Sequence, residues 1–190
     1  MADRDGISLA DSVRYRSSGR PLSRGCSGPA NANAQSPLLR GIRDYGREGY
    51  LADPDFARGV GGLAEFDLIL DLDCAWEEMP LARDLALRVP EVTVVLEHTG
   101  YPRDTQSPEY CAHWKSGIEA IAEAPNVLCK ISGLGMNRVG WTVNGLAPWV
   151  EHCVQTFGPD RCMFGSNWSV DRLYASYDAY VNAFRSPTAL

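Results

Sequence analysis

The sequence predicts an α/β fold built on a parallel sheet. Five short, largely apolar segments typical of strands alternate with segments that carry helix-capping signals or apolar residues spaced three and four apart. Alternation of this kind implies right-handed β–α–β crossovers and therefore parallel strands. Two architectures fit the pattern: an open, doubly wound sheet, or part of a (β/α)8 barrel.

The predicted strands are short and begin soon after residue 37. They are expected at 38–43, 66–72, 92–96, 126–131 and 161–165. The third of them, Val-Thr-Val-Val-Leu, is β-branched and continuously apolar, which is typical of a strand buried on both faces.

The predicted helices lie between these strands. Asp53 and Ser107 each precede a proline, an arrangement that caps a helix, so helices are expected to begin at Pro54 and Pro108. Further helices are expected over about 77–89, 146–157 and 176–184. Pro148 should then lie in the first turn of its helix, where its missing N–H is tolerated.

Residues 1–36 differ from the rest of the chain. They are rich in Ser and Arg, and their few apolar residues follow no period. We expect a poorly ordered leader over 1–36 and one folded domain over 37–190.

The overall composition limits the kinds of partner. The chain has 190 residues, 45% of them apolar, and a net charge of −6. We expect no nucleic-acid and no membrane partner, because an acidic chain does not attract anionic polymers and no apolar run approaches the roughly 20 residues of a membrane-spanning helix. The six cysteines form no CxxC pair, which favours reduced thiols and a cytoplasmic location.

Parallel α/β folds carry their chemistry at the carboxyl ends of their strands. His98 follows the most apolar strand and precedes Gly100, so it could act as a general base, polarise a carbonyl or bind a metal. A structural hydrogen bond would explain its position equally well. Arg43 could clamp a substrate carboxylate, although a surface ion pair would explain an Arg at this position at least as well.

Two further strand ends supply the remaining candidate residues. Asn167 could orient a substrate oxygen but cannot act as a base, and a local turn is the commoner use of Asn. Ser132 does not stand in a GxSxG motif, so a nucleophile elbow is not indicated. Ser132 and Trp168 complete the candidate substrate-binding residues, with packing as the alternative for Trp168.

Four strings of residues, taken in order, resemble the lactonase-like, amidohydrolase-related branch of the amidohydrolase superfamily. They are Gly-Ile-Arg at 41–43, Val-Leu-Glu-His-Thr-Gly at 95–100, Val-Leu-Cys-Lys-Ile-Ser-Gly-Leu at 127–134, and the segment 157–168 that ends in Phe-Gly-Ser-Asn-Trp. The resemblance covers about residues 37–185 and implies a TIM barrel. It also implies hydrolysis of a lactone, ester or amide of a small organic acid by activated water.

The resemblance assigns roles to particular residues. His98 matches a strand-end His of the family, Arg43 matches an Arg in the Gly-Ile-Arg string, and Asn167 stands where many members carry a general-base Asp. Many members use a divalent metal such as zinc, but the family's His-x-His on the first strand has no counterpart, because no His precedes His98. We therefore expect no tightly bound metal, with His98 as the ligand if there is one.

The missing His-x-His also bears on the extent of the barrel. The strings correspond to about five of the eight βα units, so an N-terminally truncated member is expected. Its open barrel edges would favour a homo-oligomer. Activity could be reduced or lost, and the alternative to a hydrolase is a non-catalytic remnant that acts as a binding protein.

Overall fold

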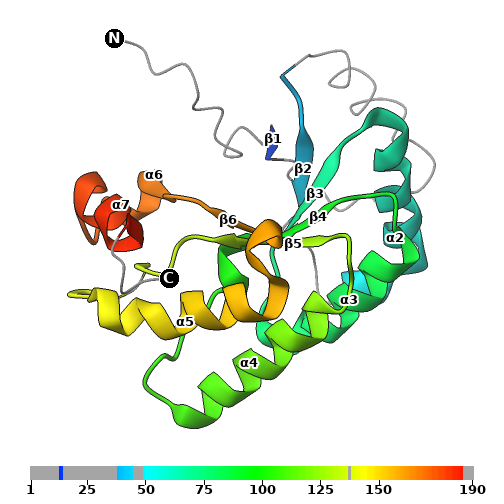
Figure 1. Ribbon diagram of the computed structural model, residues 1–190. Coiled ribbons are helices and arrows are strands. Elements are labelled where there is room, and N and C mark those ends of the chain that lie inside the picture. The colour runs from blue at the N-terminus through cyan, green and yellow to red at the C-terminus, as the bar shows by residue number, and fades with distance from the viewer. Residues whose placement is uncertain (1–12, 15–37, 45–48, 137, 186–190) are drawn as a thin grey trace.

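The structure is a computed structural model that describes residues 13–14, 38–44, 49–136 and 138–185. Its centre is one sheet of six parallel strands in the order β1-β2-β3-β4-β5-β6, so that each strand pairs with its neighbours in sequence (Figure 1). The strands are β1 (Val13–Arg14), β2 (Gly41–Asp44), β3 (Ile69–Leu72), β4 (Val94–Leu96), β5 (Val127–Ile131) and β6 (Cys162–Phe164).

This strand order decides between the two predicted architectures. A doubly wound sheet reverses its order at a switch point, whereas neighbouring staves of a (β/α)8 barrel follow one another in sequence. No reversal occurs among the described strands, so the sheet is an arc of a barrel. The five expected strands are confirmed, each somewhat shorter than expected. The expected leader over 1–36 lies outside the described residues except for β1, which pairs with β2.

The helices are α2 (Pro54–Gly61), α3 (Met79–Arg88), α4 (Pro108–Ala122), α5 (Val143–Phe157), α6 (Trp168–Asp171) and α7 (Tyr177–Arg185). Helices α2 and α4 begin at the residues that the capping signals predict. The Asp53 side chain accepts a hydrogen bond from the Asp55 backbone N–H, and the Ser107 side chain accepts one from Tyr110. Within the described ranges, no helix is both long and apolar enough to cross a bilayer.

The prediction for Pro148 is wrong. The Thr142 hydroxyl accepts a hydrogen bond from the Gly145 N–H and starts α5 at Val143. Pro148 is therefore the sixth residue of the helix and lies in its second turn. The error arose because the polar Thr142 cap begins the helix before the apolar stripe does, and the stripe alone was used to place its start.

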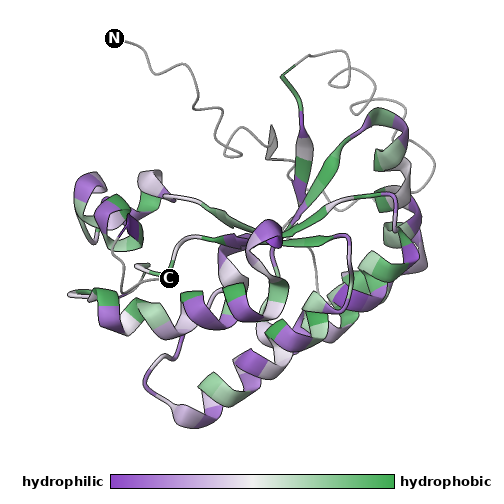
Figure 2. Ribbon diagram, in the orientation of Figure 1, coloured by the Kyte–Doolittle hydropathy of each residue, from purple (hydrophilic) through white to green (hydrophobic). Residues whose placement is uncertain are grey.

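The core lies between the sheet and the helices α3, α4 and α5, which run along one side of it (Figure 1). The central strands are hydrophobic, whereas the helices carry hydrophobic and hydrophilic faces (Figure 2). Strand β5 alternates: Cys129 is buried beside Cys153 of α5, while Lys130 turns to the opposite face and reaches Glu97. That alternation directs Lys130 toward the strand ends where the site lies.

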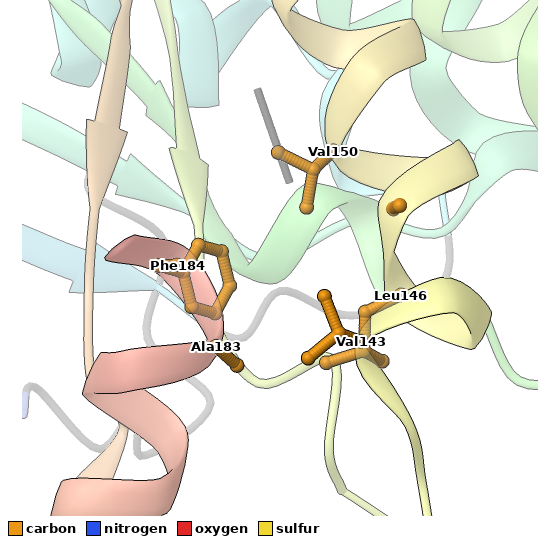
Figure 3. A pocket seen from close by; sticks show the side chains of 6 residues that line it. Val143, Leu146, Val150, Ala183 and Phe184 are labelled. Atoms are coloured by element: carbon orange, nitrogen blue, oxygen red, sulfur yellow. The ribbon is translucent and has the colours of Figure 1, made fainter. Parts of the chain in front are cut away.

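An apolar pocket lies between α5 and α7, and no charged side chain lines it (Figure 3). Its walls are the side chains of Val143, Leu146, Ala147, Val150, Ala183 and Phe184. Without a polar side chain this pocket offers nothing that activates water or binds a metal. The polar and charged side chains that could carry chemistry lie at the strand ends instead.

Candidate functional site

Glu97 is the centre of a charged network at the carboxyl ends of β2, β4 and β5. Its carboxylate is fully buried. Oε1 accepts a hydrogen bond from Lys130 Nζ at 2.8 Å, and Oε2 lies 3.6 Å from Arg43 Nη1 and 3.3 Å from His98 Nε2. Side chains from the ends of β2, β4 and β5 therefore meet at one carboxylate, as the rule for parallel sheets predicts.

Arg43 is held from a second side by Asp73 and Tyr101. Its Nη2 donates to the Tyr101 hydroxyl at 2.6 Å and lies 3.3 Å from Asp73 Oδ2, while the Tyr101 hydroxyl donates to the same oxygen at 3.2 Å. Burial raises the pKa of Asp73, and the Arg43 charge opposes that change. These contacts fix the guanidinium at the mouth of the sheet.

His98 is buried and neutral in this setting. Burial lowers the pKa of its imidazole to about 4, although the Glu97 charge acts in the opposite direction. The Ser132 hydroxyl lies 2.7 Å from Nδ1, and Glu97 faces Nε2. Since a carboxylate oxygen only accepts hydrogen bonds, this arrangement favours a proton on Nε2 and leaves Nδ1 to accept the Ser132 O–H.

Two glycines allow this close packing. A Cβ atom on Gly133, whose φ is +64°, would lie 2.8 Å from His98 Nδ1. A Cβ atom on Gly165 would lie 3.0 Å from the Ser132 Cβ and the same distance from Lys130 Cε. The glycine in the Phe-Gly-Ser-Asn-Trp string thus makes room for side chains of β5.

The chain leaves β4 through a left-handed turn. His98, Thr99, Gly100 and Tyr101 have φ angles of 51°, 53°, 70° and 52°, a run that L-residues avoid. The turn is held by a hydrogen bond from the Tyr101 N–H to the His98 carbonyl (2.9 Å) and by one from Trp114 Nε1 to the Thr99 carbonyl (2.8 Å). Strained backbone that is supported in this way is characteristic of functional sites.

Asn167 and Trp168 occupy the neighbouring strand end without joining this network. Asn167 is also left-handed, with φ 47°, and its amide approaches Asp171. Trp168 packs edge-to-face on Tyr177, with ring centroids 5.2 Å apart. Among the described residues, no hydrogen bond or ion pair joins either side chain to Arg43, His98 or Ser132.

The sequence argument missed the residue at the centre of the site. Glu97 and Lys130 both lie within the strings that carry the resemblance, but neither was given a role. A signal was present for each: an acidic side chain directly after a strand buried on both faces, and a lysine inside an apolar strand. Both need a buried partner of opposite charge. Tyr101 gave no comparable signal, because its role depends on pairing across the sheet.

The described residues do not fit a zinc site. No group of three His, Cys, Asp or Glu side chains within them is placed to share a metal ion. In the Glu97 network, His98 uses Nδ1 toward Ser132, and Glu97 already faces two cations. Protein zinc sites use three or four such ligands, so no step below depends on a metal.

Comparison with known proteins identifies the family. The model of the amidohydrolase family (Amidohydro_2) matches residues 33–190. An uncharacterized protein, y4mH, from Sinorhizobium fredii is 40% identical over 162 residues, which is 79% of this chain and 54% of that protein. An L-fucono-1,5-lactonase from Burkholderia multivorans is 33% identical over 158 residues, 74% of this chain and 52% of the lactonase. The chain spans about half the length of these curated relatives.

Solved structures agree with the fold. An amidohydrolase from Burkholderia multivorans with bound zinc superposes with a TM-score of 0.78 at 28% identity, over 87% of this chain and 62% of that one. A putative 2-pyrone-4,6-dicarboxylic acid hydrolase from Pseudomonas putida shares the fold at 17% identity, with a TM-score of 0.64 over 82% of this chain and 59% of that one. The family match over most of the chain and the barrel arc together show that this protein belongs to the amidohydrolase family, as a lactonase-like member of the amidohydrolase superfamily.

Proposed function

We propose that this protein is a hydrolase that cleaves a lactone, ester or amide bond of a small organic acid by attack of an activated water. The observation that carries the proposal is the convergence of Arg43 and His98 on the buried Glu97 at the strand ends, with Ser132 hydrogen-bonded to His98. Kinship with L-fucono-1,5-lactonases supports a lactone as the first substrate class to test.

In this proposal His98 is the general base. Its ring is neutral at pH 7 because burial lowers its pKa, so Nδ1 carries no proton, and Ser132 fixes its orientation. Water attacks the substrate carbonyl carbon and gives a proton to the Ser132 hydroxyl, which passes its own proton to Nδ1 of His98. The bond to the leaving oxygen or nitrogen then breaks, and His98 returns a proton to the leaving atom through the same hydroxyl.

The remaining candidate residues would bind the substrate. Arg43, a fixed guanidinium at the mouth, would hold the carboxylate of the organic acid. Asn167 would orient the attacked carbonyl or the water, and the partly exposed Trp168 would pack against the body of the substrate.

Replacing His98 tests the proposal. His98→Ala is expected to lower kcat/KM by about 10²- to 10⁴-fold on a hydrolysed lactone, because general-base assistance is lost. A pH-indicator assay on a panel of sugar lactones and carboxylated lactones would measure this. His113→Ala is the matched control, since His113 is an exposed residue of α4 that stacks on Trp76. Equal turnover by wild type and His98→Ala would overturn the assignment.

We also propose that the protein forms a homo-oligomer through the edge of the sheet at β6. No described strand pairs with the outer side of β6. Large apolar side chains in and after this strand are exposed, namely Phe164, Val170, Leu173 and Tyr177. A second copy would cover both the backbone edge and these side chains.

Light scattering after size-exclusion chromatography tests this surface. We expect a dimer or a larger assembly of the full chain, and Leu173→Glu is expected to shift it toward monomer because Leu173 is 72% exposed. Leu87→Glu, on the exposed side of α3, is the matched control that should leave the assembly unchanged. A monodisperse wild-type monomer would contradict the proposal.

The cytoplasmic location remains part of the same proposal. The described cysteines at 74, 111, 129, 153 and 162 are free thiols, which supports a reducing compartment.

A further inference from the structure

A second polar cluster lies beside the Glu97 network, and Asn167 is the one member of it to which the proposed function gives a role. It contains four buried polar atoms that lack a hydrogen-bond partner among the described residues: both carboxylate oxygens of Asp171, the Nδ2 of Asn167 and the hydroxyl of Tyr180. Asp171 and Tyr180 are each 1% exposed. Buried polar atoms in native proteins are nearly always paired, so a group of four requires an explanation.

The backbone brings Asp171 and Asn167 to the same side of one helical turn. Asn167 precedes α6, and Asp171 is the last residue of that helix. The Asn167 carbonyl accepts hydrogen bonds from the N–H groups of Val170 and Asp171, both at 2.9 Å. Residues four apart on such a turn are neighbours. The Asn167 amide accordingly lies close enough to the carboxylate to lower its pKa, although no hydrogen bond joins Nδ2 to either oxygen in this structure.

The carboxylate is seated against the loop that follows β5. A Cβ atom on Gly135 would lie 3.2 Å from Asp171 Oδ1 and 3.0 Å from Trp141 Nε1, so a larger residue here would require one of these side chains to move. Tyr180 of α7 faces the carboxylate and the backbone N–H groups of Gly133 and Leu134.

The same loop touches the candidate base. Gly133 packs against His98, and Gly135, two residues later, packs against Asp171. A short backbone segment therefore separates the buried carboxylate from the imidazole. The cluster is placed to influence the site although it does not itself contact His98.

We infer that Asp171 is a positioning residue that sets the orientation of the Asn167 amide. A carboxylate only accepts hydrogen bonds, so it faces the NH2 end of the amide and leaves Asn167 Oδ1 as the free acceptor at the end of β6. Asn167 would then accept a hydrogen bond from the attacking water or a substrate hydroxyl, rather than donate one to the carbonyl. Hydrogen bonds of this kind often shorten only when substrate binds. The inference rests on the proposed role of Asn167.

Protonation of Asp171 should release the amide. Burial raises the pKa of Asp171 to about 6, and the Asn167 amide opposes that change. The groups that face it are uncharged: Asn167 on its own turn, Tyr180 from α7, and Gly135 and Trp141 from the loop. A protonated Asp171 can donate to Oδ1, so the preference for one amide orientation disappears.

Nuclear magnetic resonance on the full chain tests the coupling without any substrate. We expect the Asn167 side-chain amide signals, assigned with Asn167→Ala, to shift with a midpoint near pH 6 in the wild type and to stop shifting in Asp171→Asn. Tyr180→Phe is the control, since it keeps the carboxylate and should keep the titration. Amide signals that are constant between pH 5 and 7, or that still titrate in Asp171→Asn, would overturn the inference.

Kinetics then separate positioning from structure. Asp171→Asn is expected to lower kcat by about tenfold with little change in KM, and Asp171→Glu to restore part of the loss, because misplacement of an orienting group acts on the reaction step. A loss of kcat of similar size in Asp171→Asn, Asp171→Glu and Tyr180→Phe would indicate a structural role and contradict the inference. If the wild type hydrolyses a lactone but its Asn167 amide signals do not titrate, this inference alone is refuted. If the amide signals titrate but no substrate is hydrolysed, the proposed function alone is refuted.

Discussion

Replacing Glu97 by glutamine is expected to lower the free energy of unfolding by about 3–5 kcal/mol. Glutamine keeps the size and shape of the side chain but removes its charge. Lys130 and Arg43 would then remain charged in a setting where their side chains are only 13% and 14% exposed. A buried cation that loses its counter-ion is costly, and Lys130 has Glu97 as its ion-pair partner, whereas Arg43 keeps its contact with Asp73.

Urea denaturation at pH 7 measures this loss, and Asp73→Asn is the matched control. Asp73 also pairs with Arg43, at 3.3 Å, but its side chain is 22% exposed and can be rehydrated. We expect the control to lose about 1 kcal/mol or less. Combining Glu97→Gln with Lys130→Met should recover part of the loss, because the cation that lost its partner is removed as well. Equal losses in the two single variants would contradict the central role of Glu97.

The parts of this fold that follow from local rules could be predicted from the sequence. Asp53 and Ser107 cap their helices as expected because a side-chain oxygen and the next few N–H groups are close in sequence. The strands follow from runs of apolar residues. Pro148 was misplaced because a polar cap, Thr142, begins its helix ahead of the apolar stripe.

The left-handed turn after β4 could not be predicted. Gly100 indicated a change of direction, but His98, Thr99 and Tyr101 adopt a backbone conformation that each would avoid in isolation. What holds the turn is a hydrogen bond from Trp114, fifteen residues away. Tertiary contacts of this kind leave no trace in local sequence.

The location of the candidate site could be predicted from the sequence, but the contacts among its side chains could not. The rule for parallel sheets brought Arg43, His98 and Ser132 together, because it depends only on strand order. Which side chain lies between them depends on register and on the face each residue presents, so Glu97 was missed. The partner of Asn167 was missed for a related reason: Asp171 looks like an ordinary polar helix residue until α7 and the 133–135 loop bury it.

The pH dependence of stability is expected to contain two opposite contributions, from His98 and Asp171. Burial lowers the pKa of His98 from 6.5 to about 4, so the unfolded chain binds a proton in this interval that the folded chain does not. Stability from His98 is therefore present above pH 6.5 and lost as the pH falls to 4. Burial raises the pKa of Asp171 from 3.8 to about 6, so its contribution is present below pH 3.8 and lost as the pH rises through 6.

Each contribution is about 3 kcal/mol, since one pH unit corresponds to about 1.4 kcal/mol. In the wild type they nearly cancel between pH 4 and 6.5, and single variants should separate them. Measured by urea denaturation relative to wild type, His98→Gln should gain about 3 kcal/mol as the pH falls from 7 to 4. Asp171→Asn should be more stable than wild type by about 3 kcal/mol at pH 7 and lose that advantage by pH 4.

The comparison with wild type removes the titration of every other group, so the test depends only on the two residues replaced. Curves for the two variants that run parallel to wild type would show that neither group changes its pKa on folding. If Asp171→Asn is more stable than wild type at pH 7 and loses that advantage by pH 4, Asp171 is a carboxylate that the fold retains at a cost in stability. Such a cost is typical of residues kept for function, and it would connect the stability of this chain with the orientation of Asn167 at its candidate site.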